Sequence, residues 1–331
     1  MKAIVLVGGE GTRLRPLTFT TPKQMLPVAG RPMIERVVEH LSRHGIDEVV
    51  LSLGYQPAAF VAAYPDARCA GTRLVYAVEP EPLDTGGAVA FAARHAGLEE
   101  TFVVVNGDVL SGVDLTALVA FHRRRGAEGT IHLIPVEDPS RFGVVPTDPE
   151  GRVTDFIEKP PAGQASTNLI NAGTYVLEPA VLERIGPDRR VSIERETFPA
   201  MAADRTLFAC AEATEWVDAG TPATYLAVNL AIAGRERSST HPSARVHPDA
   251  RVVNSVLGAG VVVGPGAVVE DSVVMLGTQV GEASTVRGSI LGRNVVIGRG
   301  AMVHELTVLG DEEVVGEGAL LQGERRPAVT A

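Results

Sequence analysis

The chain has 331 residues, of which 45% are hydrophobic and 21% charged, and its formal net charge is −10. This length is sufficient for a large core and about two domains, and the composition excludes a disordered or fibrous class. The acidic balance argues against nucleic acid or anionic membrane as partners, and no apolar run approaches the roughly 20 residues of a membrane span. An anionic ligand would therefore require a local basic cluster or a metal.

The cysteine content and the N-terminal residues bear on the compartment in which the protein is expected to occur. Cys69 and Cys210 stand far apart and form neither a disulfide framework nor a metal-binding spacing. The opening residues, MKAIVLVGG, contain too short an apolar stretch for a secretory signal and are typical of a first strand. We therefore expect a reducing, cytoplasmic setting.

Up to about residue 237, β-branched runs alternate with amphipathic runs. Strands are predicted at residues 2–7, 47–53, 73–78 and 101–106, and helices at 32–45, 86–97 and 114–126. Strand alternating with helix predicts an α/β fold with a doubly wound, mostly parallel, Rossmann-like sheet. Ligands of such sheets bind in the loops at the carboxyl ends of the strands, here 8–31, 79–86 and 106–113.

From about residue 240, small or aliphatic residues recur every six positions. The series includes Val262, Val268, Val274, Val280 and Val286, and after a phase slip it resumes through Ile290, Val296, Met302, Val308, Val314 and Leu320. Such hexapeptide repeats are typical of a left-handed parallel β-helix. We therefore expect a catalytic domain over 1–237 and a β-helix domain over 238–331. The open end of the β-helix would be covered by the tail GERRP or by another subunit, which favours a homo-oligomer.

The loop after the first strand, GGEGTRLRPLT (8–18), combines glycines with basic side chains. Gly8, Gly9 and Gly11 allow backbone N–H groups to approach an anion closely. Neither a Walker loop nor a dinucleotide fingerprint fits, because no GK[ST] follows and Leu14 occupies the place of the third glycine. A tight turn alone would explain the glycines. Arg13, Arg15 and Lys23 on the same loop favour a polyphosphate ligand instead.

Lysine is rare in this chain. Only Lys2, Lys23 and Lys159 occur among 30 basic residues, and the last two lie in the proline-bounded segments TPKQMLP and IEKPP. Lysine carries a compact charge on a flexible stem, whereas arginine presents a planar fork. The pattern indicates that Lys23 and Lys159 have roles that arginine could not fill.

These motifs together resemble the nucleotide-sugar pyrophosphorylases, also called sugar-1-phosphate nucleotidylyltransferases. GEGTRLRPLTFTTPKQMLPV fills every position of the family signature, and the resemblance continues through PLDTGGA, NGDVLSG, RFGVV, FIEKP, INAG and WVDAGTP. Several of these segments look most like bacterial mannose-1-phosphate guanylyltransferases. The resemblance implies transfer of a nucleotidyl group from an NTP to a sugar 1-phosphate, with release of pyrophosphate.

The resemblance also implies residue roles. Arg13, Lys23, Asp108, Lys159 and Asp218 would be catalytic, with Asp108 and Asp218 binding Mg²⁺. Glu158 would bind sugar hydroxyls and Lys159 the sugar phosphate, in a pocket with Phe142, Gly143, Asn171 and Gly173. The nucleotide would contact Leu6, Gly8, Gly9, Gly11, Thr12, Arg13, Lys23, Asp84, Thr85, Gly86, Asn106 and Asp108.

The sequence leaves alternatives open for the nucleotide base, for the sugar and for the class of reaction. Asp84 replaces a glycine common at its position; its carboxylate could accept from guanine N1–H and N2–H, or it could be an exposed turn residue. GTP and mannose 1-phosphate are the expected substrates, with glucose 1-phosphate or a cyclitol phosphate and a different NTP as the alternative. Two other classes are a hexapeptide acyltransferase, for which His304 is the only deep histidine, and a non-catalytic regulatory subunit.

Overall fold

A computed structural model describes residues 1–187, 189–236 and 239–329. Their contacts divide the chain into two compact units. The sheet unit joins Met1–Gly9 to Ile34–Trp216, and the prism unit joins Glu10–Met33 to the chain from Val217 onward. The expected domain boundary at 237/238 lies outside the described residues. The signature segment, residues 10–33, groups with the C-terminal part of the chain although it follows the first strand directly.

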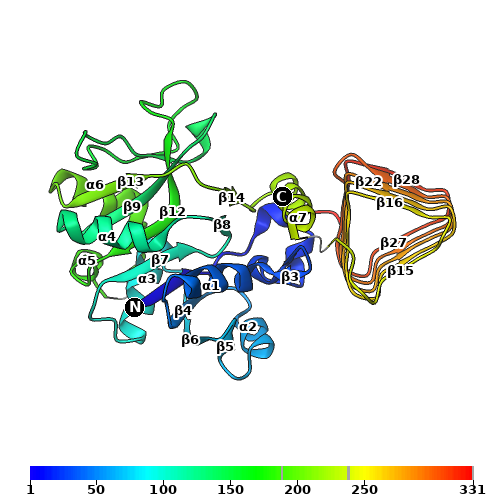
Figure 1. Ribbon diagram of the computed structural model, residues 1–331, viewed down its shortest axis with the longest axis horizontal. Helices are drawn as coiled ribbons and strands as arrows, with labels where there is room; N and C mark the ends of the chain where they lie inside the picture. The colour runs from blue at the N-terminus through cyan, green and yellow to red at the C-terminus, as the bar shows by residue number, and fades with distance from the viewer. Residues whose placement is uncertain (188, 237–238, 330–331) are drawn as a thin grey trace. The chain divides into compact units, whose positions relative to one another are not determined.

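The sheet unit is built on ten strands in the order β11-β10-β12-β7-β1-β4-β6-β5, with β9 paired to β12 and β13. Their bounds are β1 (Lys2–Leu6), β4 (Glu48–Leu53), β5 (Arg68–Cys69), β6 (Thr72–Val78), β7 (Phe102–Asn106), β9 (Gly129–Pro135), β10 (Gly143–Val144), β11 (Ile157–Glu158), β12 (Leu169–Leu177) and β13 (Leu207–Ala211). Strands β7, β1, β4 and β6 run parallel, whereas β12 runs antiparallel to β7. The expected α/β sheet is confirmed (Figure 1).

The central strands are buried on both faces because their side chains alternate between two apolar layers. Ile4, Val50 and Val104 share one layer with helix α3, and Ala3, Val5, Val49 and Leu51 on the opposite face are also fully buried. The helices are α1 (Met33–Arg43), α2 (Pro57–Ala63), α3 (Asp84–His95), α4 (Leu115–Arg125), α5 (Val181–Ile185), α6 (Phe198–Ala203) and α7 (Pro222–Glu236). Asp114 caps α4 by accepting from Ala117 N, and Gly126 ends it in the left-handed region.

Short elements complete both units. They are β2 (Pro27–Val28), β3 (Arg31–Pro32), β8 (Val109–Ser111) and β14 (Trp216–Asp218), the 3₁₀ turns η1 (Thr12–Leu14), η2 (Leu17–Phe19), η3 (Lys23–Met25) and η4 (Pro139–Arg141), and the π-helical turn η5 (Ile193–Thr197).

The C-terminal strands form three parallel sheets that close into a parallel β-helix of triangular outline, as expected (Figure 1). One sheet holds β15 (Arg245–Val246), β18 (Val262–Val263), β21 (Gln279–Val280), β24 (Val296–Ile297) and β27 (Val314–Val315). The second holds β16 (Arg251–Val253), β19 (Val268–Glu270), β22 (Thr285–Arg287), β25 (Met302–His304) and β28 (Leu320–Gln322). The third holds β17 (Val256–Leu257), β20 (Val273–Val274), β23 (Ile290–Leu291), β26 (Val308–Leu309) and β29 (Arg325–Arg326).

The predicted hexapeptide phase is correct for only part of the β-helix. Val274, Val280 and Val286 are buried as expected, but Val262, Val296, Met302, Val314 and Leu320 are exposed. At these positions the next residue points inward: Val263, Ile297, Val303, Val315 and Leu321 are at most 2% exposed. The cause is coil length, because Val263 pairs with Val280 after 17 residues and Ile297 with Val315 after 18. In a 17-residue coil one of the three sides has five residues instead of six. Positions counted strictly by six therefore lose register with the inward-facing residues.

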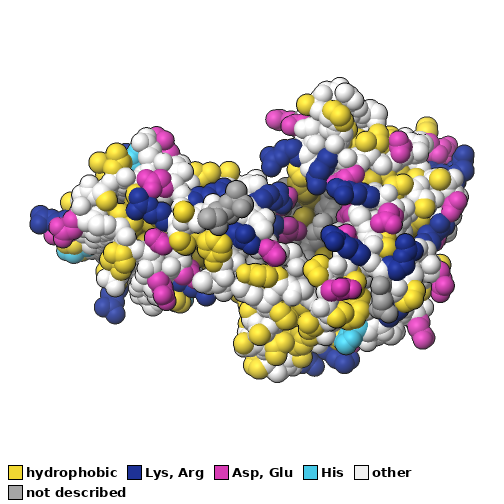
Figure 2. All heavy atoms as spheres, turned by 180° about the vertical axis from the view of Figure 1, so that it is seen from behind, with side chains coloured by type: hydrophobic (Ala, Val, Ile, Leu, Met, Phe, Trp, Pro, Cys, Tyr) yellow, Lys and Arg dark blue, Asp and Glu magenta, His cyan; other side chains and the backbone are white. Residues whose placement is uncertain are grey.

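Charges of both signs are mixed on the molecular surface. On the face in Figure 2, Lys and Arg side chains stand among Asp and Glu side chains. This mixture suits a chain with net charge −10 better than a continuous basic surface would. None of the helices in the described parts of the chain has both the length and the apolar character of a membrane span.

Candidate active site

The end of β1 provides an open backbone surface in the sheet unit. Gly8 and Gly9 follow the strand and are exposed. Gly8 packs against Gly54, where a Cβ would lie 2.9 Å from the Gly8 carbonyl oxygen, so the two loops can approach only because Gly54 lacks a side chain. Leu6, the last residue of β1, is half-buried.

The end of β7 places Asn106 and Asp108 beside β1. Gly107 N donates to Leu6 O at 2.9 Å, and a Cβ on Gly107 would lie 2.7 Å from Val7 Cγ1. Gly107 therefore lets the two strand ends meet, and the half-buried Asp108 follows directly. A carboxylate is thus presented at the carboxyl end of the sheet, where parallel sheets bind ligands.

The expected sugar-phosphate residues lie together on β10, β11 and β12 of the sheet unit. Gly143 pairs with Glu158, and a Cβ at residue 143 would lie 3.0 Å from Glu158 Oε2. Asn171 Nδ2 donates to Tyr175 Oη at 2.9 Å, and Asn171 Oδ1 accepts from Gly173 N at 2.9 Å. Phe142 contacts Trp216 edge-on at 5.6 Å between ring centroids.

Glycine at position 173 is required by both space and backbone conformation. Its φ is +74°, and an added Cβ would lie 2.6 Å from Asn106 Nδ2. The INAG segment therefore brings β12 into close approach with the end of β7. Burial raises the pKa of Tyr175 well above its ordinary value, and the charges of Glu194, Glu158 and Asp108 raise it further. Asp108 and Glu158 thus act electrostatically on the same hydroxyl.

Lys159 extends into solvent from a strained backbone position. Its φ is +51°, its side chain is 60% exposed, and its Nζ lies 3.1 Å from Glu158 Oε1. The backbone N–H of Lys159 donates to Phe142 O at 3.1 Å. Non-glycine residues with positive φ are uncommon and occur often at functional sites. The ammonium group is therefore available to an anion beside the proposed sugar pocket.

The prism unit holds the signature loop. Gly11 has φ +64°, and a Cβ there would lie 3.0 Å from Thr18 Cγ2 and 3.1 Å from Lys23 Cβ. This turn starts η1, in which Thr12 and Arg13 are exposed. Glu10, the only acidic residue of the loop, accepts from Arg15 Nη2 at 2.8 Å. The side chain of Arg13 is 57% exposed and therefore accessible to a ligand.

Lys23 and Arg13 both face Asp218. Lys23 Nζ lies 3.9 Å from Asp218 Oδ1, and Arg13 Nη2 lies 3.8 Å from Asp218 Oδ2. The Lys23 side chain is only 6% exposed, although charged side chains are seldom buried without a strong reason. Gly220 makes the approach possible, because a Cβ there would lie 2.5 Å from Asp218 Oδ1 and 2.6 Å from Arg13 Nη2. The WVDAGTP motif therefore converges with the signature loop.

The Asp218 carboxylate has the properties of a metal ligand. Its Oδ1 is buried and has no hydrogen-bond partner among the described residues, and both ion pairs are longer than hydrogen bonds. A carboxylate oxygen that is buried without a hydrogen bond is costly, and a cation that contacts it directly would offset this cost. In the described part of the chain no three His, Cys, Asp or Glu residues form a metal cluster.

The expected base-binding segment, Asp84 to Gly86, forms hydrogen bonds that its sequence did not indicate. Asp84 Oδ2 accepts from Arg190 Nε at 2.8 Å. Thr85 Oγ1 donates to Glu194 Oε2 at 2.5 Å. Gly86 N donates to Val191 O at 2.8 Å. The first turn of α3 is thus tied to residues 190–194.

Sequence reasoning missed Glu79, at the carboxyl end of β6. Its Oε1 accepts from Ser52 Oγ at 2.9 Å and its Oε2 from Leu83 N at 3.2 Å. A Cβ on Gly8 would lie 3.4 Å from Glu79 Oε1, so this half-buried carboxylate stands directly beside the glycine loop. The available signal was its place in the loop after a parallel strand, but no special residue type marked it.

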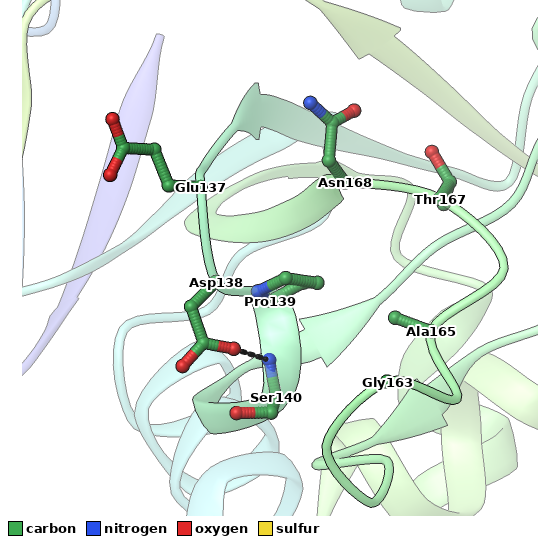
Figure 3. A pocket seen from close by; sticks show the side chains of 8 residues that line it. All are labelled: Glu137, Asp138, Pro139, Ser140, Gly163, Ala165, Thr167 and Asn168. Atoms are coloured by element: carbon green, nitrogen blue, oxygen red, sulfur yellow. Dashed lines mark hydrogen bonds between the residues drawn. The ribbon is translucent and has the colours of Figure 1, made fainter.

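A separate cavity of about 410 Å³ opens between two loops of the sheet unit (Figure 3). Its lining residues are Glu137, Asp138, Pro139, Ser140, Gly163, Ala165, Thr167 and Asn168. Asp138 caps the turn η4 by accepting from Ser140 N. None of the sequence-predicted site residues lines this cavity, so we assign it no part in the site.

The predicted residues therefore form two sets. The sheet unit brings together Asn106, Asp108, Gly143, Glu158 and Asn171 with Phe142, Lys159 and Gly173 around the ends of β7, β10, β11 and β12. The prism unit brings together Arg13, Lys23 and Asp218. Asp84, Thr85 and Gly86 lie at the start of α3, which is tied to residues 190–194.

Two family models match the chain. One described as "Nucleotidyl transferase" matches residues 2–235, and one described as "GMPPB C-terminal domain" matches residues 235–325. The chain is 46% identical over 226 residues to the mannose-1-phosphate guanylyltransferase of Mycobacterium tuberculosis. It is 42% identical over 229 residues to the mannose-1-phosphate guanylyltransferase catalytic subunit beta of Dictyostelium discoideum. Each match covers 68% of this chain, but only 62% and 63% of the respective relative.

Solved structures agree with these matches. HddC from Yersinia pseudotuberculosis, in a structure complexed with GMP-PN, superposes with a TM-score of 0.61 at 27% identity, covering 70% of this chain and 99% of that chain. A putative glucose-1-phosphate thymidylyltransferase from Bacillus anthracis gives 0.63 at 25% identity, covering 70% of this chain and 95% of that chain.

Proposed function

The chain belongs to the nucleotidyl transferase family, and on that premise we propose that it transfers a nucleotidyl group from an NTP to a sugar 1-phosphate. In the finer form of the proposal the substrates are GTP and mannose 1-phosphate. Two relatives named as mannose-1-phosphate guanylyltransferases support this form, as does the GMP-PN complex of the Yersinia structure. The products would be GDP-mannose and pyrophosphate.

The chemistry is an in-line displacement at phosphorus. An oxygen of the sugar phosphate attacks the α-phosphorus, the new P–O bond forms, and the bond from the α-phosphorus to the bridging oxygen breaks. The bond electrons leave with pyrophosphate. The sugar phosphate is mostly dianionic near neutral pH, so no general base is needed. Each pair of unit charges ~4 Å apart repels by about 4 kcal/mol at an effective dielectric of about 20. Positioning and charge neutralisation therefore carry the catalysis.

Residues of the prism unit suit the triphosphate side of this reaction. Arg13, with its exposed side chain, would stabilise the leaving pyrophosphate. Lys23, almost fully buried beside Asp218, would contact the α-phosphate during transfer. The backbone N–H groups of Gly8, Gly9 and Gly11 would surround the phosphates as an anion-binding loop. Thr12 belongs to the same loop.

Residues of the sheet unit suit the sugar-phosphate side. Glu158 would accept hydrogen bonds from sugar hydroxyls, and Lys159 would orient the attacking phosphate oxygen. Gly143 and Gly173 would shape the pocket, because their close approaches leave no room for a side chain. Asn171, oriented by its hydrogen bonds to Tyr175 and Gly173, would line it. The aromatic edge of Phe142 would border it.

We propose Asp108 and Asp218 as the ligands of a divalent metal, specifically Mg²⁺. The buried Oδ1 of Asp218, which has no hydrogen-bond partner among the described residues, supports this assignment. When bound, the ion would supply positive charge to the reacting phosphates.

Base selectivity is proposed to depend on a carboxylate. Glu79 stands beside Gly8 with both oxygens oriented by hydrogen bonds, and it could accept from guanine N1–H and N2–H. Asp84 is the other candidate, but its carboxylate would first have to leave Arg190. Thymine and adenine do not offer the same pair of donors. Glu79→Gln should reduce the preference for GTP if Glu79 reads the base.

The proposal also includes the wider organisation of the protein. We propose residues 1–237 as the catalytic domain and 238–331 as a β-helix that supports it. The partners of the protein would be its small-molecule substrates. The chain would assemble into a homo-oligomer. The free thiols of Cys69 and Cys210 are consistent with a reducing, cytoplasmic setting.

The convergence of Arg13 and Lys23 on Asp218 carries this proposal most strongly. A merely structural loop has no need to place two cations around a half-buried carboxylate without a hydrogen bond to either of them. The test is pyrophosphate release with four NTPs and with mannose, glucose and cyclitol phosphates. We expect release with GTP and mannose 1-phosphate above all other pairs. Preference for another pair would correct the substrates, and no release with any pair would reject the function.

A further inference from the structure

The signature segment contacts a corner of the β-helix that no substrate role accounts for. Thr20 Oγ1 donates to Asp311 Oδ2 at 2.7 Å, and Arg293 Nη2 donates to Thr21 Oγ1 at 2.8 Å. Arg325 Nη1 donates to the carbonyl oxygen of Arg13 at 3.3 Å. These contacts all lie within the prism unit.

The corner is itself organised by hydrogen bonds and close packing. Asp311 Oδ1 accepts from the backbone N–H of Arg293 at 2.8 Å, so both oxygens of Asp311 are engaged. A Cβ on Gly310 would lie 3.2 Å from Pro16 Cβ, so the signature segment packs closely on the corner. We name Arg293, Asp311 and Arg325 the clamp corner.

The opposite side of the segment is held by helix α7. Asn229 Oδ1 accepts from Ala29 N at 2.8 Å, and Tyr225 Oη donates to Pro27 O. Both of these side chains are fully buried. The segment itself has three short 3₁₀ turns, η1 to η3, and the two-residue strands β2 and β3. The 3₁₀ turns provide weaker hydrogen-bond geometry than a regular helix. Its conformation therefore depends on contacts with α7 and with the clamp corner.

We propose that the clamp corner is a positioning site for the phosphate-binding segment, so that the β-helix takes part in catalysis through Arg13 and Lys23. The inference rests on the proposed function for the roles of these two residues. Arg325 contacts the backbone of Arg13 directly, and Asp311 and Arg293 fix Thr20 and Thr21, which precede Lys23 by two to three residues. Because displacing a charged group by about 1 Å can cost on the order of 100-fold in rate, loss of the clamp should reduce turnover.

Asp311→Ala is the primary test, and Asp271→Ala is its matched control. Asp271 is also a β-helix corner aspartate, and its hydrogen bond at 2.6 Å comes from Asn254 Nδ2, a residue of the β-helix itself. We expect Asp311→Ala to lower kcat on the order of tenfold or more and to raise KM for the NTP. KM for the sugar phosphate should change little, since the proposed sugar residues belong to the sheet unit. Asp271→Ala should remain within about twofold of the wild type.

Two further readouts separate positioning from general destabilisation. Amide hydrogen exchange should accelerate in Asp311→Ala at Leu14 and Leu26, whose N–H groups bond within the segment, and stay unchanged in β1. In a double-mutant cycle, Thr20→Val should cost little when added to Asp311→Ala, because both remove the same hydrogen bond.

The outcomes distinguish this inference from the proposed function. A wild-type protein inactive with every substrate pair rejects the function, while the exchange measurement still tests the clamp. An active wild type in which Asp311→Ala matches Asp271→Ala in kcat and exchange overturns the inference. Faster exchange with unchanged kcat overturns it equally, because the segment would then be held without consequence for the reaction.

Discussion

At the scale of single residues, Lys23 combines rarity with burial. It is one of three lysines in the chain, its side chain is 6% exposed, and its Nζ lies 3.9 Å from Asp218 Oδ1. A planar guanidinium needs more space than an ammonium group and presents its charge in a fixed plane. Because the Lys23 side chain is almost fully buried, a larger guanidinium would have to fit among the surrounding residues.

Lys23→Arg should therefore lose most turnover, on the order of 100-fold, with the fold intact. The matched control is Lys2→Arg, because the exposed Lys2 side chain forms an ion pair at 2.9 Å with the buried Glu48 that arginine can also form. The measurements are kcat by pyrophosphate release and the thermal midpoint of each variant. Near wild-type turnover of Lys23→Arg would reject the explanation for lysine at this position.

The convergence of residues that are distant in sequence could be predicted where a motif fixes both residue type and spacing. Arg13, Lys23 and Asp218 come from two motifs almost 200 residues apart, and the structure places them together. The pairing of Asp84 with Arg190 could not be predicted, because an exposed ion pair between residues 106 apart leaves no local pattern. Glu79 was missed for a similar reason, since its hydrogen bonds depend on the chain returning to Ser52.

At the scale of elements, the β-helix shows how a repeat can be recognised while its register is wrong. Periodicity of six identifies the three-sheet architecture, but the five-residue side of each 17-residue coil moves the inward position by one. Only the slip after Val286 was visible in the sequence, because adjacent valines fill both inward and outward positions elsewhere. Where the same residue type occupies two adjacent positions of a strand, the sequence does not show which of the two faces the interior.

Ile297→Ala and Val296→Ala test the register directly. Ile297 is 1% exposed and Val296 is 37% exposed, although the repeat had assigned Val296 to the interior. We expect Ile297→Ala to lower the free energy of unfolding by about 2–5 kcal/mol, because it leaves a cavity in the β-helix core. Val296→Ala should change it by about 0.5 kcal/mol or less. Equal losses in urea denaturation of the two variants would contradict the observed register.

Strand β9 contains a titratable group that links stability to pH. His132 is fully buried, and neither of its ring nitrogens has a hydrogen-bond partner among the described residues. Burial lowers the pKa of His132 to about 4. The unfolded chain, with an ordinary pKa of about 6.5, therefore binds more protons between those values, and stability falls as the pH drops from about 6.5 towards 4.

His132→Leu should make this loss smaller. At pH 5 the wild type should have lost on the order of 2 kcal/mol through this histidine relative to pH 7.5, and the variant should lack that component. Burial also lowers the pKa of His40, so a residual acid sensitivity remains in both proteins. The measurement is urea unfolding at the two pH values. Identical pH dependence of variant and wild type would show that His132 does not titrate as proposed.

At the scale of the whole molecule, the order of secondary structure was predictable but the grouping of segments was not. Alternating strands and helices indicated the sheet, and the repeat indicated the β-helix. The signature segment follows β1 in sequence, yet it groups with α7 and the β-helix corner, which it contacts through hydrogen bonds. The pattern of residues along the chain does not show with which unit this segment packs.

The central claim is that metal and basic residues neutralise phosphate charge during nucleotidyl transfer. Its most direct test is pyrophosphate release from GTP and mannose 1-phosphate by the wild type, with Mg²⁺ and with excess chelator, beside Asp108→Asn and Asp218→Asn. We predict turnover only for the wild type with Mg²⁺, and loss of at least about 100-fold in the other cases. Undiminished release in chelator, or by both variants, would contradict the account.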